Sequence, residues 1–157
     1  MPLSIKSPAF KANGPIPREY TCEGKDTAPE LTWNGTSGKV RSFALIVDDP
    51  DAPDPTAPKM TYVHWVLYDM PASATGIQKG GKTPAGTRDG KNDWKRIGYG
   101  GPCPPIGRHR YFFKLYALDT LLGDLQSPTK DQLLKAMQGH VVEQAELMGT
   151  YEKEKKA

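Results

Sequence analysis

Three stretches of this chain are apolar enough to be strands buried inside a sheet. The run "FALIV" (Phe43–Val47) is continuous and bounded by turn residues, as in a strand covered on both faces. "YVHWVLYDM" (Tyr62–Met70) and "YFFKLYALD" (Tyr111–Asp119) are rich in β-branched and aromatic residues, which favour strands. The pattern therefore predicts three central strands in a β-rich body.

The C-terminal quarter of the chain changes to helical spacing. In "SPTKDQLLKAMQGH", Thr129 begins a capping-box pattern and Gly139 follows as a stop signal. The next segment, "HVVEQAELMGTY", places Val141, Ala145 and Met148 on one face of a helix. We therefore expect two short helices near the C-terminus, beside a β-sandwich or a large antiparallel sheet.

Proline and glycine divide the chain into many short pieces. The 15 prolines and 16 glycines are spread along the sequence rather than gathered in a linker, which indicates short elements joined by ordered loops. A chain of 157 residues is long enough to bury one core. We expect a single domain, 1–157, in which roughly 151–157 ("YEKEKKA") is a frayed tail.

Charge and hydropathy exclude several partners. The net charge is only +3, part of it lies in the tail, and no basic stripe is interleaved with aromatics, so nucleic acid is not expected. No apolar run reaches the length of a membrane span or of a signal-peptide core, so we expect no integral membrane association and a cytoplasmic location.

The two cysteines, Cys22 and Cys103, are too few for a disulfide framework and are not spaced as metal ligands. In a reducing compartment, two free thiols are favoured over a disulfide.

The long polar stretch 71–98 contains a misleading motif. "GIQKGGKT" (Gly76–Thr83) fits the P-loop pattern, but that motif needs a helix after it to bind phosphates. The following residues, "PAGTRDGKNDW", are unsuited to a helix, so we expect a flexible loop rather than a nucleotide site. A loop of this length in a compact domain is usually functional or mobile.

Unusual polar residues adjoin all three predicted strands. Individually they have structural explanations, since a histidine in an apolar strand is more often a core residue and aspartates between prolines are common in turns. Together they would build a small preformed pocket, with the glycines allowing backbone amides to approach a ligand. These residues are Asp48, Asp49, Asp51, Asp54, His64, Gly100, Gly101, His109, Arg110 and Tyr111.

"DDPDAP", then "HW", then "GYGGPCPPIGRHRYFFKLYALD" resemble the phosphatidylethanolamine-binding protein family, also called Raf kinase inhibitor-like proteins. The flanks "YTCEGKDTAPELTWNG" and "GHVVEQAELMGTY" are similar to its bacterial and archaeal branch, often labelled YbhB/YbcL, so the resemblance covers most of the chain. It implies a mostly β fold of two antiparallel sheets, a Greek-key-like β-sandwich with a few short peripheral helices.

The resemblance also implies a non-catalytic binding protein without cofactor or metal. Its small anion cavity would accept phosphate-like anions or phosphorylated head groups, and the loop 101–105 would form a wall. The residues carried over to that cavity are Asp49, Asp51, His64, Gly101, Pro105, His109 and Tyr111.

The residue types suit an anion, with one difficulty. His64 and His109 can donate N–H groups, and neither motif contains lysine, so we expect modest binding that depends on shape. The aspartates would repel an anion unless they orient the histidines, hold a proton, or accept from a bound head group. We favour the first role for one of them.

The remaining charged residues near the motifs have structural interpretations. We expect Asp48 and Asp54 to be turn or surface residues, and Arg110 to pair with one of the aspartates.

Two other functions stay open. One is a kinase or protease inhibitor that acts through a protein–protein surface; a homodimer is also left open. The other, less favoured, is a hydrolase or metal-dependent enzyme, because the chain has no G-x-S-x-G or H-E-x-x-H motif. Cys103 is the one plausible nucleophile, although a packed or disulfide-bonded cysteine is favoured there.

Overall fold

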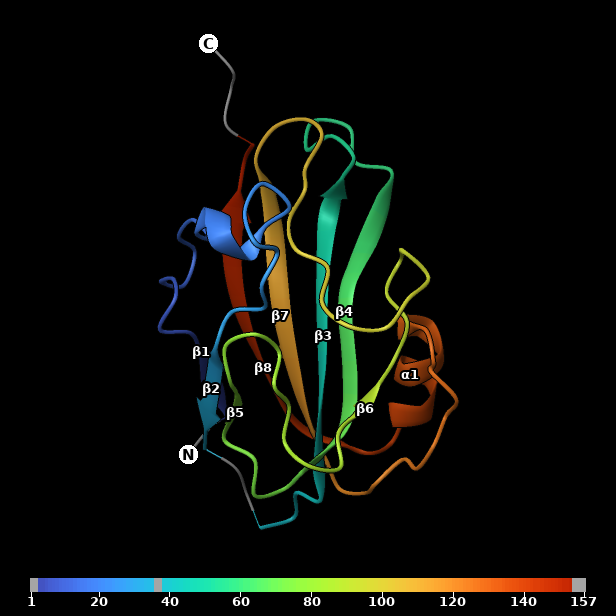
Figure 1. The fold of residues 1–157 in the computed structure, drawn as a ribbon. Coiled ribbons are helices and arrows are strands. Elements are labelled where there is room, and N and C mark those ends of the chain that lie inside the picture. The colour runs from blue at the N-terminus through green and yellow to red at the C-terminus, as the bar shows by residue number, and fades with distance from the viewer. Residues whose placement is uncertain (1–2, 36–37, 154–157) are drawn as a thin grey trace.

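A computed structural model describes residues 3–35 and 38–153. Within these residues, the strands form two antiparallel sheets that lie against each other (Figure 1). The smaller sheet has the order β1-β2-β5, formed by β1 (Ser4–Lys6), β2 (Leu31–Asn34) and β5 (Gly76–Ile77). The larger has the order β6-β4-β3-β7-β8, formed by β3 (Ser42–Ala52), β4 (Met60–Pro71), β6 (Arg88–Asp89), β7 (His109–Leu118) and β8 (Val141–Tyr151). The two helical segments are the 3-10 turn η1 (Arg18–Tyr20) and the helix α1 (Lys130–Met137).

The three predicted central strands are confirmed as β4, β3 and β7, side by side in the middle of the larger sheet. Strand β3 has both faces covered, as its continuous apolar run predicted. Phe43 and Leu45 face the core between the sheets, whereas Ile46 packs in a second cluster with Leu133 and Met137 of α1. The side chains alternate because successive residues of a strand point to opposite faces.

Strand β3 continues beyond "FALIV" to Ala52, so Asp48, Asp49 and Asp51 lie in the strand rather than in a loop after it. Aspartates between prolines suggested a turn, but these three residues belong to the strand. Strand pairing continues because Asp48 and Asp49 still pair with Val63 and Tyr62 of β4.

The first predicted helix is confirmed as α1. The Thr129 side chain accepts from the backbone N–H of Gln132, whose side chain in turn accepts from the Thr129 backbone, a complete capping box.

The second predicted helix is wrong, because that segment is strand β8. It pairs along its length with β7, and its inward residues Ala145, Leu147 and Tyr151 follow a period of two rather than a helical period. The backbone groups at the edge of β7 need hydrogen-bond partners. This requirement outweighs the weak helical pattern of the segment, which therefore forms a strand.

The expectation of free thiols is also wrong. Cys22 and Cys103 form a disulfide, with their Cα atoms 5.4 Å apart. The bond joins the segment after η1 to the loop that leads into β7, and the N–H of Cys22 also donates to the carbonyl oxygen of Pro102 (3.1 Å). A sequence separation of 81 residues concealed this proximity.

The polar stretch 71–98 holds the short strands β5 and β6 and is otherwise made of turns and bridges. The P-loop-like segment begins with β5 and is followed by turns rather than a helix, in agreement with the rejection of a nucleotide site.

The ends of the chain bear on two expectations. Tyr151, which was included in the predicted tail, is the buried last residue of β8. Residues 154–157 of that tail lie outside the described residues. In the part of the chain that the structure describes, no helix is long and apolar enough to cross a membrane.

Candidate functional site

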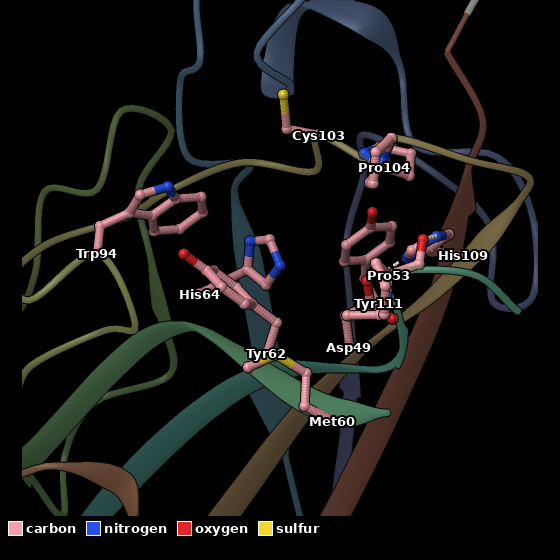
Figure 2. Close-up of a pocket in the computed structure, with 12 residues that line it drawn as sticks. Asp49, Pro53, Met60, Tyr62, His64, Trp94, Cys103, Pro104, His109 and Tyr111 are labelled. Carbon is pink, nitrogen blue, oxygen red and sulfur yellow. Dashed lines mark hydrogen bonds and ion pairs between the residues drawn. The ribbon is translucent and has the colours of Figure 1, made fainter. Parts of the chain in front are cut away.

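A cavity of about 320 Å³ opens where β3 ends and β4 and β7 begin, at the upper end of the molecule in Figure 1. Strand ends and the loop before β7 supply its walls, shown in Figure 2. The lining residues are Asp49, Ala52, Pro53, Met60, Tyr62, His64, Trp94, Cys103, Pro104, Pro105, His109 and Tyr111.

Strand alternation brings the polar side chains to this one face. His109 and Tyr111 stand two residues apart on β7, and Asp49 faces the same side from β3. On β4, Tyr62 and His64 are again two residues apart. Side chains two residues apart in a strand share a face, so the chain needs no special turn to gather these groups.

A β-bulge places His64 in the cavity. Val47 pairs with Trp65 but the next residue, Asp48, pairs with Val63, so His64 is an extra residue on β4. Val63 therefore packs under α1, while Trp65 belongs to the core between the sheets. His64 and Trp65 thus project on the same side of the sheet despite being consecutive.

His109 joins Asp49 to two loops. Its Nδ1 lies 2.5 Å from Asp49 Oδ2, and its Nε2 lies 2.8 Å from the carbonyl oxygen of Ile106 and 3.1 Å from that of Pro53. Carbonyl oxygens only accept, so Nε2 carries a proton, and a second proton is shared between Nδ1 and the carboxylate. The expectation that one aspartate orients a histidine is confirmed for Asp49. The donor role expected of His109 is not available in this arrangement, because both ring nitrogens already face protein oxygens.

His64 has one ring nitrogen engaged and one directed at the cavity. Its Nδ1–H donates to the carbonyl oxygen of Gly100 (2.8 Å). Its Nε2 has no hydrogen-bond partner among residues 3–35 and 38–153. Burial, at 4% exposed, lowers the pKa of His64 below its usual value, because desolvation disfavours the imidazolium. His64 is therefore neutral at pH 7.

Tyr111 presents a hydroxyl that has no partner. The side chain is only 1% exposed, and its Oη makes no hydrogen bond to any described residue. Burial raises the pKa of Tyr111, so the group stays a neutral hydroxyl. The Tyr111 and His64 rings lie edge to face, with centroids 5.2 Å apart, on two sides of the same opening (Figure 2). A buried polar group without a partner usually marks a place for a ligand or water.

Aromatic and apolar side chains that the sequence did not single out complete the cavity. Trp94 packs edge to face against Tyr62 (5.0 Å) and His64 (5.1 Å). Asn92 holds the loop of Trp94, since its Oδ1 accepts from the N–H of Trp94 (2.9 Å). Gly100 is required for this packing, because a Cβ there would lie 2.1 Å from the Trp94 ring.

Part of this wall could have been found from the sequence. Met60 and Tyr62 precede His64 at a spacing of two, which is the signal for a shared strand face. Trp94 has no such signal, since it reaches the site from the polar stretch.

Of the remaining predicted site residues, two lie outside the cavity lining and one belongs to it. Asp51 is absent from the cavity lining and pairs through both oxygens with Arg110, at 2.8 and 2.9 Å, which confirms the predicted pairing of Arg110. Gly101 is also outside the lining, whereas Pro105 belongs to it.

The expectation that backbone amides approach a ligand at Gly100 and Gly101 is wrong. The N–H of Gly100 donates to the carbonyl oxygen of His64 (3.0 Å), and that of Gly101 donates to Asp26 Oδ1 (2.8 Å).

The other two aspartates differ from each other. Asp54 is a turn residue, as expected, whose Oδ1 accepts from the N–H of Thr56 (3.0 Å). Asp48 is fully buried on the opposite face of β3, where its Oδ2 pairs with Lys130 Nζ (2.6 Å) and Lys114 Nζ (3.2 Å). The expectation of a turn or surface position is wrong for Asp48, since the strand continues through it.

The described residues contain no cluster of three or more metal-ligating side chains. Cys103 lines the cavity, but its sulfur is bonded to Cys22.

Known proteins are similar to this chain in sequence and in fold. The family model described as phosphatidylethanolamine-binding protein matches residues 6–152. A relative from Methanothermobacter thermautotrophicus, named UPF0098 protein, is 44% identical over 153 residues, covering 95% of this chain and 98% of its own. The crystal structure of a homologue of this family from Chlamydia trachomatis has a TM-score of 0.91 at 39% identity, covering 98% of this chain and 99% of that one.

The crystal structure of E. coli YbcL, described as a new member of the mammalian family, has a TM-score of 0.87 at 30% identity, covering 98% of this chain and all of that one. The family model spans β2 to β8 in full, so it includes every strand that lines the cavity. The chain belongs to the phosphatidylethanolamine-binding protein family.

Proposed function

We propose that this chain is a non-catalytic binding protein whose cavity accepts a phosphate-like anion or a phosphorylated head group. The observation that carries the proposal is the pair of unpartnered groups, His64 Nε2 and the Tyr111 hydroxyl, which converge on one cavity. Buried polar groups without partners cost free energy, and a ligand that hydrogen-bonds to both removes that cost.

The shape of the cavity supports a ligand with two parts. About 320 Å³ is near the lower limit for small-molecule sites and exceeds what a phosphate group alone needs. The phosphate would lie at the polar end, between His64 and Tyr111. An organic group bonded to it would contact Met60, Trp94 and Pro104 at the apolar walls (Figure 2).

Charge balance supports an anion despite the nearby carboxylate. Asp49 shares a proton with His109 and accepts from the N–H of Asp51 (2.7 Å), so both of its oxygens are engaged within the protein. A carboxylate whose charge is balanced in this way repels a ligand far less than a free one.

Two observations favour binding over catalysis. The sulfur of Cys103, the candidate nucleophile, is bonded to Cys22. The nitrogens of His109, a candidate acid or base, are both held by protein oxygens. Neither of these two groups is therefore free to act as a nucleophile or as an acid or base on a bound ligand.

The proposal is tested by titrating the protein with inorganic phosphate and with phosphoethanolamine, using isothermal calorimetry. Tyr111→Phe removes only the hydroxyl, so phosphate affinity should fall about tenfold, the usual loss for a hydrogen bond to a charged group. Tyr116→Phe is the matched control, since Tyr116 packs with the cluster under α1, away from the cavity. Equal phosphate affinity in wild type and Tyr111→Phe would contradict the proposal.

Regulation of a partner protein, such as a kinase or a protease, stays a prediction that rests on the resemblance. A homodimer and a cytoplasmic location also stay predictions. Inhibition assays in which Tyr111→Phe replaces the wild type would show whether a filled cavity matters to a partner.

A further inference from the structure

The cavity offers a ligand few hydrogen-bond donors. None of the lysines or arginines in residues 3–35 and 38–153 lines it. The amides of Gly100 and Gly101 and both nitrogens of His109 are engaged within the protein. Among the described lining residues, the donors left are neutral: the buried Tyr111 hydroxyl, the Tyr62 hydroxyl and the Nε1–H of Trp94.

The second free group, His64 Nε2, is an acceptor. A carbonyl oxygen only accepts, so the proton of the neutral ring must be on Nδ1, which donates to Gly100. Gly100 also donates its N–H to the carbonyl oxygen of His64, so these two residues are tied twice and the ring orientation is held. The neutral ring therefore presents a lone pair to the cavity.

The surroundings of His64 maintain the neutral ring. Edges of Tyr62, Trp94 and Tyr111 pack around it at 5.1 to 5.4 Å between centroids. Every nearby carboxylate has its own partner: Asp49 with His109, Asp48 with Lys114 and Lys130, and Asp93 with the N–H of Val63. The titratable groups facing the ring are thus Asp49, Tyr62, Asp93, His109 and Tyr111, and Asp48 acts on it from the opposite face of β3.

A fully ionised anion suits this arrangement poorly. Its oxygens can accept from Tyr111, but an oxygen facing Nε2 would meet another lone pair. A phosphate that keeps one proton can instead donate its P–OH group to Nε2 and accept from the Tyr111 hydroxyl.

Resting on the proposed phosphate site, we propose that His64 selects the protonation state of the ligand: the cavity binds a phosphate group together with one proton. Whether that proton lies on the phosphate oxygen or on Nε2, the complex of a phosphomonoester holds one proton more than neutral His64 and the ester dianion, whereas the dianion of inorganic phosphate already carries the proton. Two specificities follow. Phosphate is preferred over sulfate, which carries no proton at neutral pH. A phosphomonoester, whose second ionisation lies near pH 6, is preferred over a diester, which has no P–OH group.

Calorimetry with phosphoethanolamine, inorganic phosphate and sulfate tests this inference in the wild-type protein. At pH 8, in two buffers of different ionisation enthalpy, binding of phosphoethanolamine, whose phosphate dianion has no P–OH group, should take up close to one proton per site. The affinity for phosphoethanolamine should fall as the pH rises above the second ionisation of its phosphate, near about pH 6, by about tenfold per pH unit for one linked proton. At pH 7, sulfate should bind at least about tenfold more weakly than phosphate, the effect of one lost hydrogen bond to a charged group.

The variant His64→Gln tests whether the proton uptake depends on His64. In His64→Gln the side-chain amide can donate N–H to a dianion, so proton uptake should disappear and sulfate should approach phosphate in affinity. His140→Gln is the matched control, because His140 is exposed and pairs with Asp119 (2.8 Å) far from the cavity lining, and it should keep the proton uptake. The wild-type measurement stands alone if His64→Gln fails to fold.

The outcomes separate this inference from the proposed function. Equal binding of phosphate and sulfate without proton uptake would overturn the inference and leave the phosphate site intact. Proton uptake that persists in folded His64→Gln would also overturn it. No binding of phosphate at any pH would overturn the proposed function and the inference with it.

Discussion

Asp48 and Asp49 are neighbours in the chain and are equally buried, at 0% and 3% exposed, yet they serve opposite sides of one sheet. Asp48 lies under α1 and pairs with the ammonium groups of Lys114 and Lys130. Asp49 faces the cavity and shares a proton with His109. Strand alternation alone separates them, since consecutive side chains point to opposite faces.

The difference lies in what surrounds each carboxylate. The partners of Asp48 are two lysine ammonium groups, and Asp48 is not among the residues that line the cavity. The partner of Asp49 is an imidazole that also holds two loop carbonyls at the cavity wall. The same residue type thus secures a helix on one face and arranges a site on the other.

The largest expected effect concerns the cavity side, where loops rather than a helix form the walls. Replacing both cysteines (Cys22→Ser with Cys103→Ser) should lower the free energy of unfolding by about 4 kcal/mol, because the bond closes a loop with a separation of 81 residues. Phosphate should also bind more weakly, since Cys103 and Pro104 line the cavity. Urea unfolding and calorimetry measure both. Wild type treated with dithiothreitol should match the variant, and unchanged phosphate affinity in both would show that the wall is held without the bond.

The next largest effect should be a loss of stability on the face of the sheet that α1 covers, without a change at the cavity. Asp48→Ala leaves Lys114 and Lys130 without their shared carboxylate, so the free energy of unfolding should fall by about 3 kcal/mol. Phosphate affinity should not change, because Asp48 is on the opposite face of β3. Asp124→Ala, at an exposed aspartate, serves as the control for urea unfolding. A loss of phosphate binding with unchanged stability would refute this division of roles.

The smallest effect concerns Asp51, which pairs with a half-exposed arginine. Arg110 donates to both oxygens of Asp51 and holds the pKa of that carboxyl below its ordinary value. A carboxyl whose pKa is lowered in the folded state stabilises the protein above its unfolded pKa, near about 3.9, and loses this contribution as the pH falls through the folded pKa. Asp51→Asn should therefore lower the free energy of unfolding at neutral pH by about 1 kcal/mol, since solvent screens the exposed pair.

The pH dependence distinguishes this pair from the buried ones. The stability gap between wild type and Asp51→Asn should stay constant from neutral pH down to about pH 5 and close below about pH 4. Thermal unfolding over that range measures it. A gap that instead widens on acidification would show that the carboxyl is not stabilised in its charged form.

Much of the fold followed from local pattern. The three central strands could be predicted because their apolar runs are rich in β-branched and aromatic residues, which favour strands. Helix α1 could be predicted because its capping box is a local signal. Strand β8 was mistaken for a helix because Val141, Ala145 and Met148 happen to fit a helical period. The decisive fact, an unpaired edge of β7, belongs to another part of the chain.

The site was predicted in part. Five of the predicted residues do line one cavity: Asp49, His64, Pro105, His109 and Tyr111. The family motifs indicated all five. The uses of their atoms could not be predicted, since they depend on which carbonyl or carboxylate lies within 3 Å. Gly101 and Asp51 were expected at the ligand and instead bond to Asp26 and Arg110.

The sequence by itself determined the residue types, the alternation along each strand and the membership of a family. Only the tertiary structure decided what lies on each face of β3, and so which partners Asp48 and Asp49 have. It also decided that Cys22 and Cys103 form a disulfide. It placed the β-bulge that directs His64 toward Tyr111. The physical reason is the distance along the chain over which each interaction acts. Periodicity and capping act within a few residues, whereas the protonation and pairing of a buried group are set by atoms brought together from distant parts of the chain.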